Sequence, residues 1–257
     1  MRDLRLFFFK VGDGHCSYIE FPNGENGLVD VKVTHEENQD DVINILKTAK
    51  IGRLDYLFIT HPHRDHIEGL DEIVDNFSIG QFICPPVDFI PDPIYDSWEI
   101  YEEMRKGNYC DKASEVTEGW YSNIGDTRID YIAPRKKLLE EFPDDINNNG
   151  LILKIESRGH RIIIPGDTEE ECWEQISDNE IKNTTLLLAA HHGNDSGYCL
   201  EKVKAMNLAF VVISAGPKTE YDADEKYKNQ VREKVYTTRQ NKIVARVDEQ
   251  HNLHMIS

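Results

Sequence analysis

Three histidines and an aspartate lie within the six-residue segment His61-Pro62-His63-Arg64-Asp65-His66. An apolar run at 54–60 precedes it and predicts a strand, whereas residues 69–77, which follow it, have the apolar spacing of a helix. His61 and His63 alternate as strand residues do, so both side chains can point to one side. Asp65 and His66 lie past the bend and can reach a second point. Because imidazoles and carboxylates are ligands that Zn²⁺ or Mn²⁺ accept, the segment predicts a metal site.

A carboxylate at the end of another buried strand is the second expected part of this site. The tripeptide Gly-Asp-Thr occurs twice, and only the copy containing Asp167 follows an apolar run, at 162–165. An acid that leaves a buried strand has the position that a bridging metal ligand needs. Asp126, in the other copy, precedes its strand and is expected to be a turn residue. The alternative for Asp167 is a helix N-cap ahead of Glu169 and Glu170.

Two adjacent histidines, His191 and His192, end a third apolar run, at 185–190. They repeat the arrangement of the first segment, although a pair of core histidines would give the same pattern. The sequence does not decide which ring binds metal. The other ring would face the substrate or carry a proton, so both histidines, together with Asp65, are candidate catalytic residues.

These segments supply enough ligands for two divalent metal ions that share Asp167. The predicted ligands are His61, His63, Asp65, His66, Asp167 and the pair His191 and His192. Two cations about 3.5–4 Å apart can activate a water and hold both oxygens of a phosphoryl displacement, so no serine or cysteine nucleophile is needed. The sequence therefore predicts a hydrolase with two zinc or manganese ions as cofactors.

The formal net charge of −18 limits the partners of this chain. It argues against sequence-independent binding of long nucleic acid, whose affinity comes largely from Lys and Arg at phosphates. It does not exclude a phosphate-containing substrate, because bound cations reverse the local sign of the charge. Short or single-stranded nucleic acid and small phosphodiesters are therefore the expected substrates. A protein partner and a homo-oligomer remain open alternatives.

Cysteine usage and apolar runs indicate the compartment. The five cysteines are dispersed, which argues against a disulfide framework and against a cysteine-based zinc site. Most are expected to be small core residues, although Cys199 lies near the histidine pair and could line the site. No apolar run approaches the roughly 20 residues that cross a bilayer, and the run at 6–9 is too short for a secretory signal. A cytoplasmic location and one domain, 1–257, are expected.

Apolar periodicity predicts an α/β (α+β) fold. Early strands meander, and later strands alternate with helices. Among the later elements, a strand is predicted at 116–120, a helix at 227–235 and a closing hairpin at 242–256. Two similar halves, each a sheet with helices outside, fit a four-layer αββα sandwich. Four aromatic residues in the segment 85–120 could cap the site, join a partner or belong to the core: Trp98, Tyr101, Tyr109 and Trp120.

With these motifs in place, the chain resembles the metallo-β-lactamase superfamily, and within it the ComEC-type metallo-hydrolase domain and its stand-alone relatives. Besides the histidine-rich segment, the resemblance depends on Val11-Gly12-Asp13-Gly14-His15-Cys16, Asn147-Asn148-Asn149-Gly150-Leu151-Ile152-Leu153, Pro165-Gly166-Asp167, His191-His192-Gly193 and Val212-Ile213-Ser214-Ala215-Gly216. It implies the αββα fold of this superfamily and metal-dependent hydrolysis. For the ComEC-type branch it implies phosphodiester substrates, DNA in particular, with Asp65 binding metal and holding the attacking water.

Two departures from the family pattern affect the expected site. Many superfamily members have a further histidine between the first loop and the strand-end aspartate, but residues 67–159 contain none, and Asn147 to Asn149 stand in this region. The first metal position is therefore expected to be weak or completed by water, which also argues against β-lactam hydrolysis. A His-Pro pair common in the branch is absent from residues 220–224, so substrate contacts there are expected to differ.

The leading hypothesis is a metal-dependent phosphodiesterase or nuclease. An esterase or lactonase acting on a small acyl substrate would use the same metals. A non-catalytic binding protein that retains the fold is a third alternative, although the intact ligand set argues against it. An oxidoreductase of the flavodiiron type is disfavoured, because the sequence shows neither a fuller ligand set nor a sign of a flavin partner.

Overall fold

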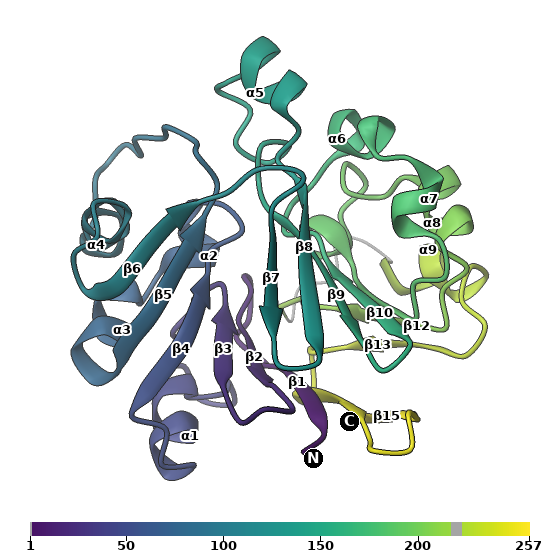
Figure 1. Cartoon of the computed structure of the whole chain (residues 1–257), viewed down its shortest axis with the longest axis horizontal. Helices are drawn as coiled ribbons and strands as arrows, with labels where there is room; N and C mark the ends of the chain where they lie inside the picture. Colours follow the sequence, from purple (N-terminus) through teal and green to yellow (C-terminus); the bar gives the residue numbers. More distant parts are fainter. Residues whose placement is uncertain (1, 217–222) are drawn as a thin grey trace.

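Two β-sheets pack face to face in the computed structural model, which describes residues 2–216 and 223–257, and helices cover their outer faces (Figure 1). Within the described residues, the first sheet has the strand order β15-β14-β1-β2-β3-β4-β5-β6, and the second has β13-β12-β11-β10-β9-β8-β7. The strands of the first sheet are β1 (Leu4–Phe8), β2 (Ser17–Glu20), β3 (Asn26–Val29), β4 (Arg53–Phe58), β5 (Ser78–Cys84), β6 (Cys110–Glu115), β14 (Ile243–Val247) and β15 (Leu253–Ile256). Those of the second are β7 (Tyr121–Ile124), β8 (Thr127–Ala133), β9 (Ile152–Ser157), β10 (His160–Ile164), β11 (Leu186–Leu188), β12 (Phe210–Ile213) and β13 (Lys234–Thr237).

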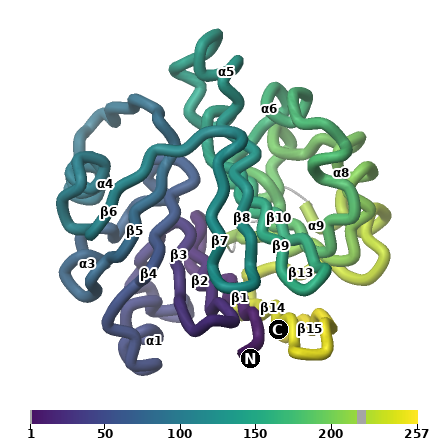
Figure 2. The backbone as a smooth tube through the Cα atoms, viewed as in Figure 1, coloured from purple at the N-terminus to yellow at the C-terminus, as the bar shows by residue number. Residues whose placement is uncertain are grey.

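The two sheets follow the same plan. Each begins as an antiparallel meander, β1 to β3 in the first sheet and β7 to β10 in the second. Each continues with parallel strands, β3 to β6 and β10 to β13. The predicted closing hairpin forms β14 and β15 and returns to the first sheet, where Figure 2 shows it beside the start of the chain and β14 pairs with β1.

Three apolar clusters occupy the spaces between the four layers. One lies between the sheets and contains residues such as Phe8, Ile129 and Leu153. A second packs the first sheet against α1 (Val42–Thr48), α3 (Leu70–Asn76) and α4 (Asp96–Arg105). The third packs the second sheet against α5 (Lys136–Glu141), α6 (Glu170–Gln175), α7 (Asp178–Ile181), α8 (Leu200–Met206) and α9 (Ala223–Lys228). The predicted αββα sandwich is confirmed.

Two predicted elements are wrong. The helix expected at 227–235 divides into the end of α9 and strand β13, which pairs in parallel with β12. Tyr227, Val231 and Val235 have helical spacing, but the run Val235-Tyr236-Thr237 also favours a strand, and an open sheet edge is there to receive it. The strand expected at 116–120 is instead the connection between the sheets, where Gly119 has a φ of +87°.

The aromatic residues of the segment 85–120 do not act as one group. Tyr101 is fully buried, and Trp98 packs against the apolar cluster beneath α4. Tyr109 and Trp120 are more than half exposed. None of the helices in the described part of the chain is long and apolar enough to cross a membrane.

Candidate metal centre

The histidine-rich segment follows the carboxyl end of β4, an interior strand of the first sheet, and enters α2 (Arg64–Ile67). His61 is fully buried, and its Nε2 has no hydrogen-bond partner. The His63 ring lies edge-on to the His61 ring, with centroids 4.8 Å apart. Asp65 and His66 follow in the first turn of α2, where the Asp65 side chain is 40% exposed and His66 is buried. The bend predicted between the two pairs is therefore the start of this helix.

Asp167 follows β10 on the second sheet and reaches the same place. It is 4% exposed and lies with Gly166 in the turn that follows Pro165. Gly166 has a φ of +57°, and a Cβ there would lie 2.8 Å from Thr60 at the end of the β4 segment. Only glycine lets the two strand ends come this close. Asp126 of the first Gly-Asp-Thr copy lies in the β7–β8 turn, as predicted, 3.5 Å from the Arg158 guanidinium.

The adjacent histidines reach opposite sides of the Asp167 carboxylate. His191 Nε2 is 3.6 Å from Oδ2, and His192 Nε2 is 3.6 Å from Oδ1. Both residues lie in the short helical turn η1 (Ala190–Gly193) with left-handed φ values of 48° and 54°. Such backbone costs on the order of 1–3 kcal/mol per residue, so the surrounding structure must hold it in place. The sequence could not predict this division of the pair.

Each oxygen of Asp167 therefore faces two imidazoles. On the Oδ2 side, His61 Nε2 lies at 3.7 Å and His191 Nε2 at 3.6 Å. On the Oδ1 side, His66 Nε2 lies at 3.1 Å and His192 Nε2 at 3.6 Å. Asp65 joins the second side, with its Oδ2 3.3 Å from His192 Nε2. One ligand atom each from Asp65, His66, Asp167 and His192 lies within 4.8 Å of all the others.

The side chains present fit divalent cations. Four imidazole nitrogens converge on one buried carboxylate. A buried imidazole nitrogen such as His61 Nε2 is costly to leave without a partner, and a cation would provide one. Imidazole and carboxylate together match borderline ions such as zinc. Six of the seven predicted ligands lie against one another around Asp167, and His63 joins them through its ring contact with His61.

Asp30, which no motif in the sequence singled out, orients the His66 ring. It is fully buried at the end of β3. Its carboxylate accepts hydrogen bonds from Thr60 N at 2.7 Å and Thr60 Oγ1 at 2.8 Å, and lies 2.8 Å from His66 Nδ1. This contact turns His66 Nε2 toward Asp167, as carboxylates that support metal-binding histidines do. The signal was present in the sequence, as a single acid in the apolar run Leu28-Val29-Asp30-Val31.

Glu169 plays the corresponding part for His191. Its Oε1 lies 2.9 Å from His191 Nδ1 and 3.4 Å from Asn147 Nδ2. Asn148 Oδ1 accepts hydrogen bonds from the backbone of Glu169 and Cys172, so the Asn-rich stretch holds the start of α6 in place. The Asn-rich segment thus supports the site through Glu169.

The glycine turn after β1 supports the other side. Gly14 has a φ of +139°, and a Cβ there would lie 2.5 Å from the Asp65 carbonyl oxygen. His15 N donates to that carbonyl at 3.1 Å. Ser214 links this turn to the histidine pair, because its Oγ donates to Gly14 O at 2.9 Å while its own carbonyl lies 3.1 Å from His192 Nδ1.

Charges within the cluster shift its pKa values in opposite directions. Burial would raise the pKa of Asp167, but His66 and His192 outweigh it and hold that pKa well below the ordinary value. Burial opposes protonation of His66, yet Asp167 and Asp30 raise its pKa well above 6.5. The pKa of His192 is raised in the same way, against burial, by Asp167 and Asp65. Burial lowers the pKa of His61 and of His63.

These shifts predict that metal binding releases protons. The raised pKa values of His66 and His192 favour the cationic, protonated form of these rings in the metal-free protein. A cation binds only the neutral ring, so we expect net release of up to about two protons per chain and an affinity that rises with pH. Titration calorimetry with Zn²⁺ in buffers of different ionisation enthalpy measures this release. An observed heat that is the same in all buffers would contradict the prediction.

Other candidate residues lie elsewhere. His160 begins β10, and its Nε2 is 2.9 Å from His251 O, away from Asp167 at the other end of the strand. Cys199 precedes α8 and packs against the apolar cluster of the second sheet. Of the segment 220–224, only Ala223 and Asp224 are among the described residues.

Comparisons with known proteins agree with this geometry. The family model described as the metallo-beta-lactamase superfamily matches residues 11–214. ComE operon protein 3 of Bacillus subtilis (strain 168) is 26% identical over 184 residues, which cover 70% of this chain and 22% of that protein. The chain thus spans about a fifth of the length of this curated relative.

Solved structures share the fold at low sequence identity. The metallo-beta-lactamase fold protein YhfI from Bacillus subtilis has a TM-score of 0.62 at 11% identity, covering 96% of this chain and 100% of that one. Igni18, a metallo hydrolase from Ignicoccus hospitalis KIN4/I, has a TM-score of 0.59 at 16% identity, covering 99% of each chain.

Proposed function

Because this chain belongs to the metallo-β-lactamase superfamily, we propose that it is a phosphodiesterase that holds two divalent cations, zinc or manganese, on either side of Asp167. The observation that carries this proposal is the division of four imidazoles between the two oxygens of one buried carboxylate. A carboxylate so placed can bridge two cations.

The geometry supports a specific division of the ligands. The first cation would be held by His61, His63, His191 and Asp167, and the second by Asp65, His66, His192 and Asp167. Many relatives have a further histidine ligand between the first loop and the strand-end aspartate, and residues 67–159 of this chain have none. His191 would take its place, because it faces the same Asp167 oxygen as His61 does. Glu169 and Asp30 would fix the rings of His191 and His66.

Two cations held by these residues would polarise the phosphoryl group and lower the pKa of an attacking water. Asp65, His191 and His192 line a cavity of about 300 Å³, which gives a substrate access to these side chains. The Asp65 side chain is more exposed than those of Asp30 and Asp167. Burial would raise its pKa, but the facing His192 and His66 keep that pKa low. It therefore stays ionised and can accept a hydrogen bond from a water that enters the cavity.

The acidic surface favours small or single-stranded substrates over long duplexes. With a net charge of −18, the chain lacks the excess of cations that holds a duplex by its phosphates. The resemblance of the motifs to the ComEC-type branch, which implies phosphodiester substrates, supports a substrate of the nucleic-acid class.

An esterase or lactonase activity is the second candidate. A hollow of about 320 Å³ beside His63 is lined by Phe89, Pro91, Pro93 and Tyr95, and these side chains suit an apolar acyl group. The same hollow suits a nucleobase, because Phe89 and Tyr95 offer aromatic surfaces.

Hydrolysis of bis-p-nitrophenyl phosphate with Mn²⁺ or Zn²⁺ tests the phosphodiesterase proposal. Asp65→Ala is expected to lower kcat by about 10²- to 10⁴-fold, because it removes both a candidate ligand and the acceptor for the attacking water. Asp75→Ala, which removes an exposed acid from α3, serves as the matched control and should leave kcat unchanged. Turnover of p-nitrophenyl acetate without turnover of any phosphodiester would overturn the proposal in favour of the esterase.

A further inference from the structure

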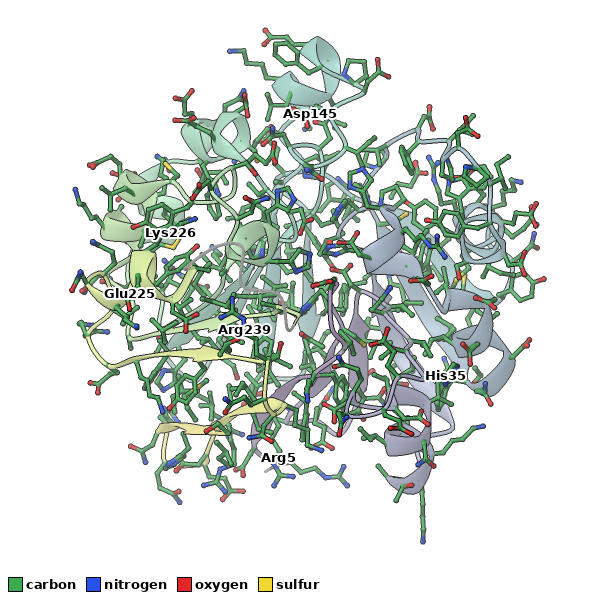
Figure 3. All side chains as sticks on the ribbon, turned by 180° about the vertical axis from the view of Figure 1, so that it is seen from behind. Arg5, His35, Asp145, Glu225, Lys226 and Arg239 are labelled. Carbon is green, nitrogen blue, oxygen red and sulfur yellow. The ribbon has the colours of Figure 1, made fainter. Side chains whose placement is uncertain are left out.

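The cavity beside the candidate metal centre is lined by an arginine as well as by candidate ligands. Asp65, His191 and His192 line it, and so do Arg239 and Ala223. Arg239 lies in the turn after β13, and Figure 3 labels it near the middle of the rear face of the molecule. Among the cavity-lining residues that the structure describes, it is the one lysine or arginine. A positive charge at this position is notable in a chain with a net charge of −18.

Within the described part of the chain, the Arg239 guanidinium forms one long ion pair, with Asp224, and no hydrogen bond. Its Nη1 is 3.9 Å from Asp224 Oδ1, which is too long for a hydrogen bond. Its buried Nε has no hydrogen-bond partner, and Asp224 Oδ1 has none either. A guanidinium offers five N–H donors, and none of those on Arg239 is hydrogen-bonded to a described residue. The cavity also contains Asp13, which lies against Gly216.

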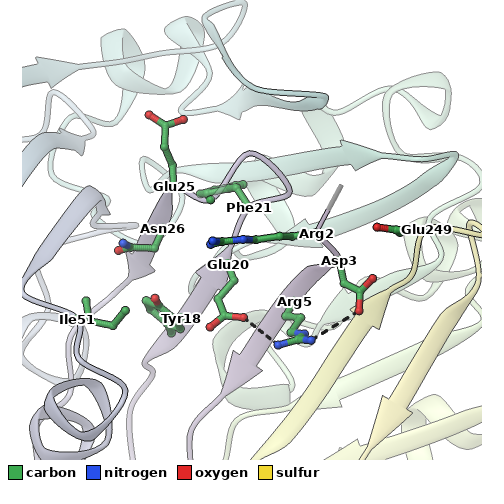
Figure 4. Close-up of a pocket in the computed structure, with 11 residues that line it drawn as sticks. Arg2, Asp3, Arg5, Tyr18, Glu20, Phe21, Glu25, Asn26, Ile51 and Glu249 are labelled. Carbon is green, nitrogen blue, oxygen red and sulfur yellow. Dashed lines mark hydrogen bonds and ion pairs between the residues drawn. The ribbon is translucent and has the colours of Figure 1, made fainter.

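A larger hollow at the opposite end of the first sheet provides the contrast. It has a volume of about 520 Å³ and is lined in part by Arg2, Arg5 and Glu20 (Figure 4). There Arg5 already pairs with Glu20 at 3.4 Å and with Asp3 at 3.6 Å. Arg5 thus shares its charge with two carboxylates, whereas, among the described residues, Arg239 has one, Asp224, near it.

We infer that Arg239 binds a second phosphate of the substrate, next to the one that is cleaved. This inference rests on the proposed function. A guanidinium pairs with two phosphate oxygens at once, and it does so more strongly in a cavity than at an open surface. The preferred substrate class is then a phosphodiester with a neighbouring phosphate, such as a short oligonucleotide or a dinucleotide with a 5′-phosphate. A diester that carries no further anion leaves Arg239 unused.

The test compares a thymidine dinucleotide with and without a 5′-phosphate on the metal-loaded full chain. The wild type should have the lower KM for the phosphorylated dinucleotide. Arg239→Ala should raise that KM by about 10- to 100-fold, the range expected for one charge-assisted contact, while kcat on bis-p-nitrophenyl phosphate stays unchanged. Arg239→Lys keeps the charge but not the two-pronged geometry, and it should restore part of the lost affinity.

Two controls separate binding from folding. Arg232→Ala removes an arginine that is nearby in the sequence, does not line the cavity and instead contacts Leu208 O. This variant should behave as the wild type. Asp224→Asn removes the acid nearest to Arg239 and should lower the KM for the phosphorylated dinucleotide. Equal loss on every substrate in Arg239→Ala, or no loss on any, overturns the inference.

A binding measurement keeps the inference testable if phosphodiesters are not cleaved. Calorimetry of the metal-loaded chain with thymidine 3′,5′-bisphosphate and with thymidine 5′-monophosphate compares one phosphate with two. Tighter binding of the bisphosphate that is lost in Arg239→Ala supports the inference even if hydrolysis fails, in which case only the proposed function is wrong. Equal affinities for the two nucleotides in the wild type overturn it.

Discussion

Replacement of Asp167 by alanine is expected to abolish binding of both cations and to reduce hydrolysis by about 10³-fold or more, because water attacks far more slowly without a cation to lower its pKa. The carboxylate faces His61 and His191 with Oδ2, and His66 and His192 with Oδ1. Its loss leaves each side with imidazoles but without the shared anion. Plasma mass spectrometry of the metal content and hydrolysis of bis-p-nitrophenyl phosphate measure the two effects.

The chain contains its own matched control for this experiment. Asp126 lies in the other copy of the Gly-Asp-Thr tripeptide, in the β7–β8 turn beside Arg158. Asp126→Ala should therefore keep the metal content and kcat of the wild type. If Asp167→Ala still binds two cations per chain, the assignment of Asp167 as a shared ligand is wrong.

Asp30→Ala is expected to have the largest effect on stability. The substitution removes the acceptor of two hydrogen bonds from Thr60 and the partner of His66 Nδ1, all in a fully buried position. A buried charged pair that loses one partner typically costs about 3–5 kcal/mol, because the other partner stays buried without compensation. Urea unfolding of the metal-free protein should show a free energy of unfolding lower by about that amount.

Asp30→Asn serves as the comparison. Asparagine keeps the shape and one carbonyl acceptor for Thr60 but removes the charge that faces His66. We expect a loss of stability between those of the wild type and Asp30→Ala. An Asp30→Ala protein as stable as the wild type would mean that Asp30 does not hold the tips of β3 and β4 together.

The motifs identified this site because the three segments around His61, Asp167 and His191 each follow an apolar run, and these runs form β4, β10 and β11. β10 and β11 are neighbours in the second sheet, and the end of β4 in the first sheet meets the end of β10 where Gly166 approaches Thr60. Asp30 and Glu169 were harder to recognise, because their roles depend on the side chains that they face. Glu169 reads locally as the first acid of a run at the start of a helix. Nothing near Arg239 in the sequence indicates a cavity.

The predicted helix at 227–235 fails for a related reason. The apolar spacing of Tyr227, Val231 and Val235 is local information, whereas the open edge of β12 that accepts β13 is not. In the same way, the separation of His191 from His192 depends on left-handed backbone, which residues other than glycine adopt uncommonly.

The residues around Asp167 come from both halves of the sandwich, with the 61–66 segment on the first sheet and Asp167 and His191 on the second. Cations held between them would link one half of the sandwich to the other. By thermodynamic linkage, a cation at a thousand times its dissociation constant adds about 4 kcal/mol to the free energy of unfolding. The supply of metal in the cell would then govern how long this chain survives proteolysis as well as how fast it hydrolyses its substrate.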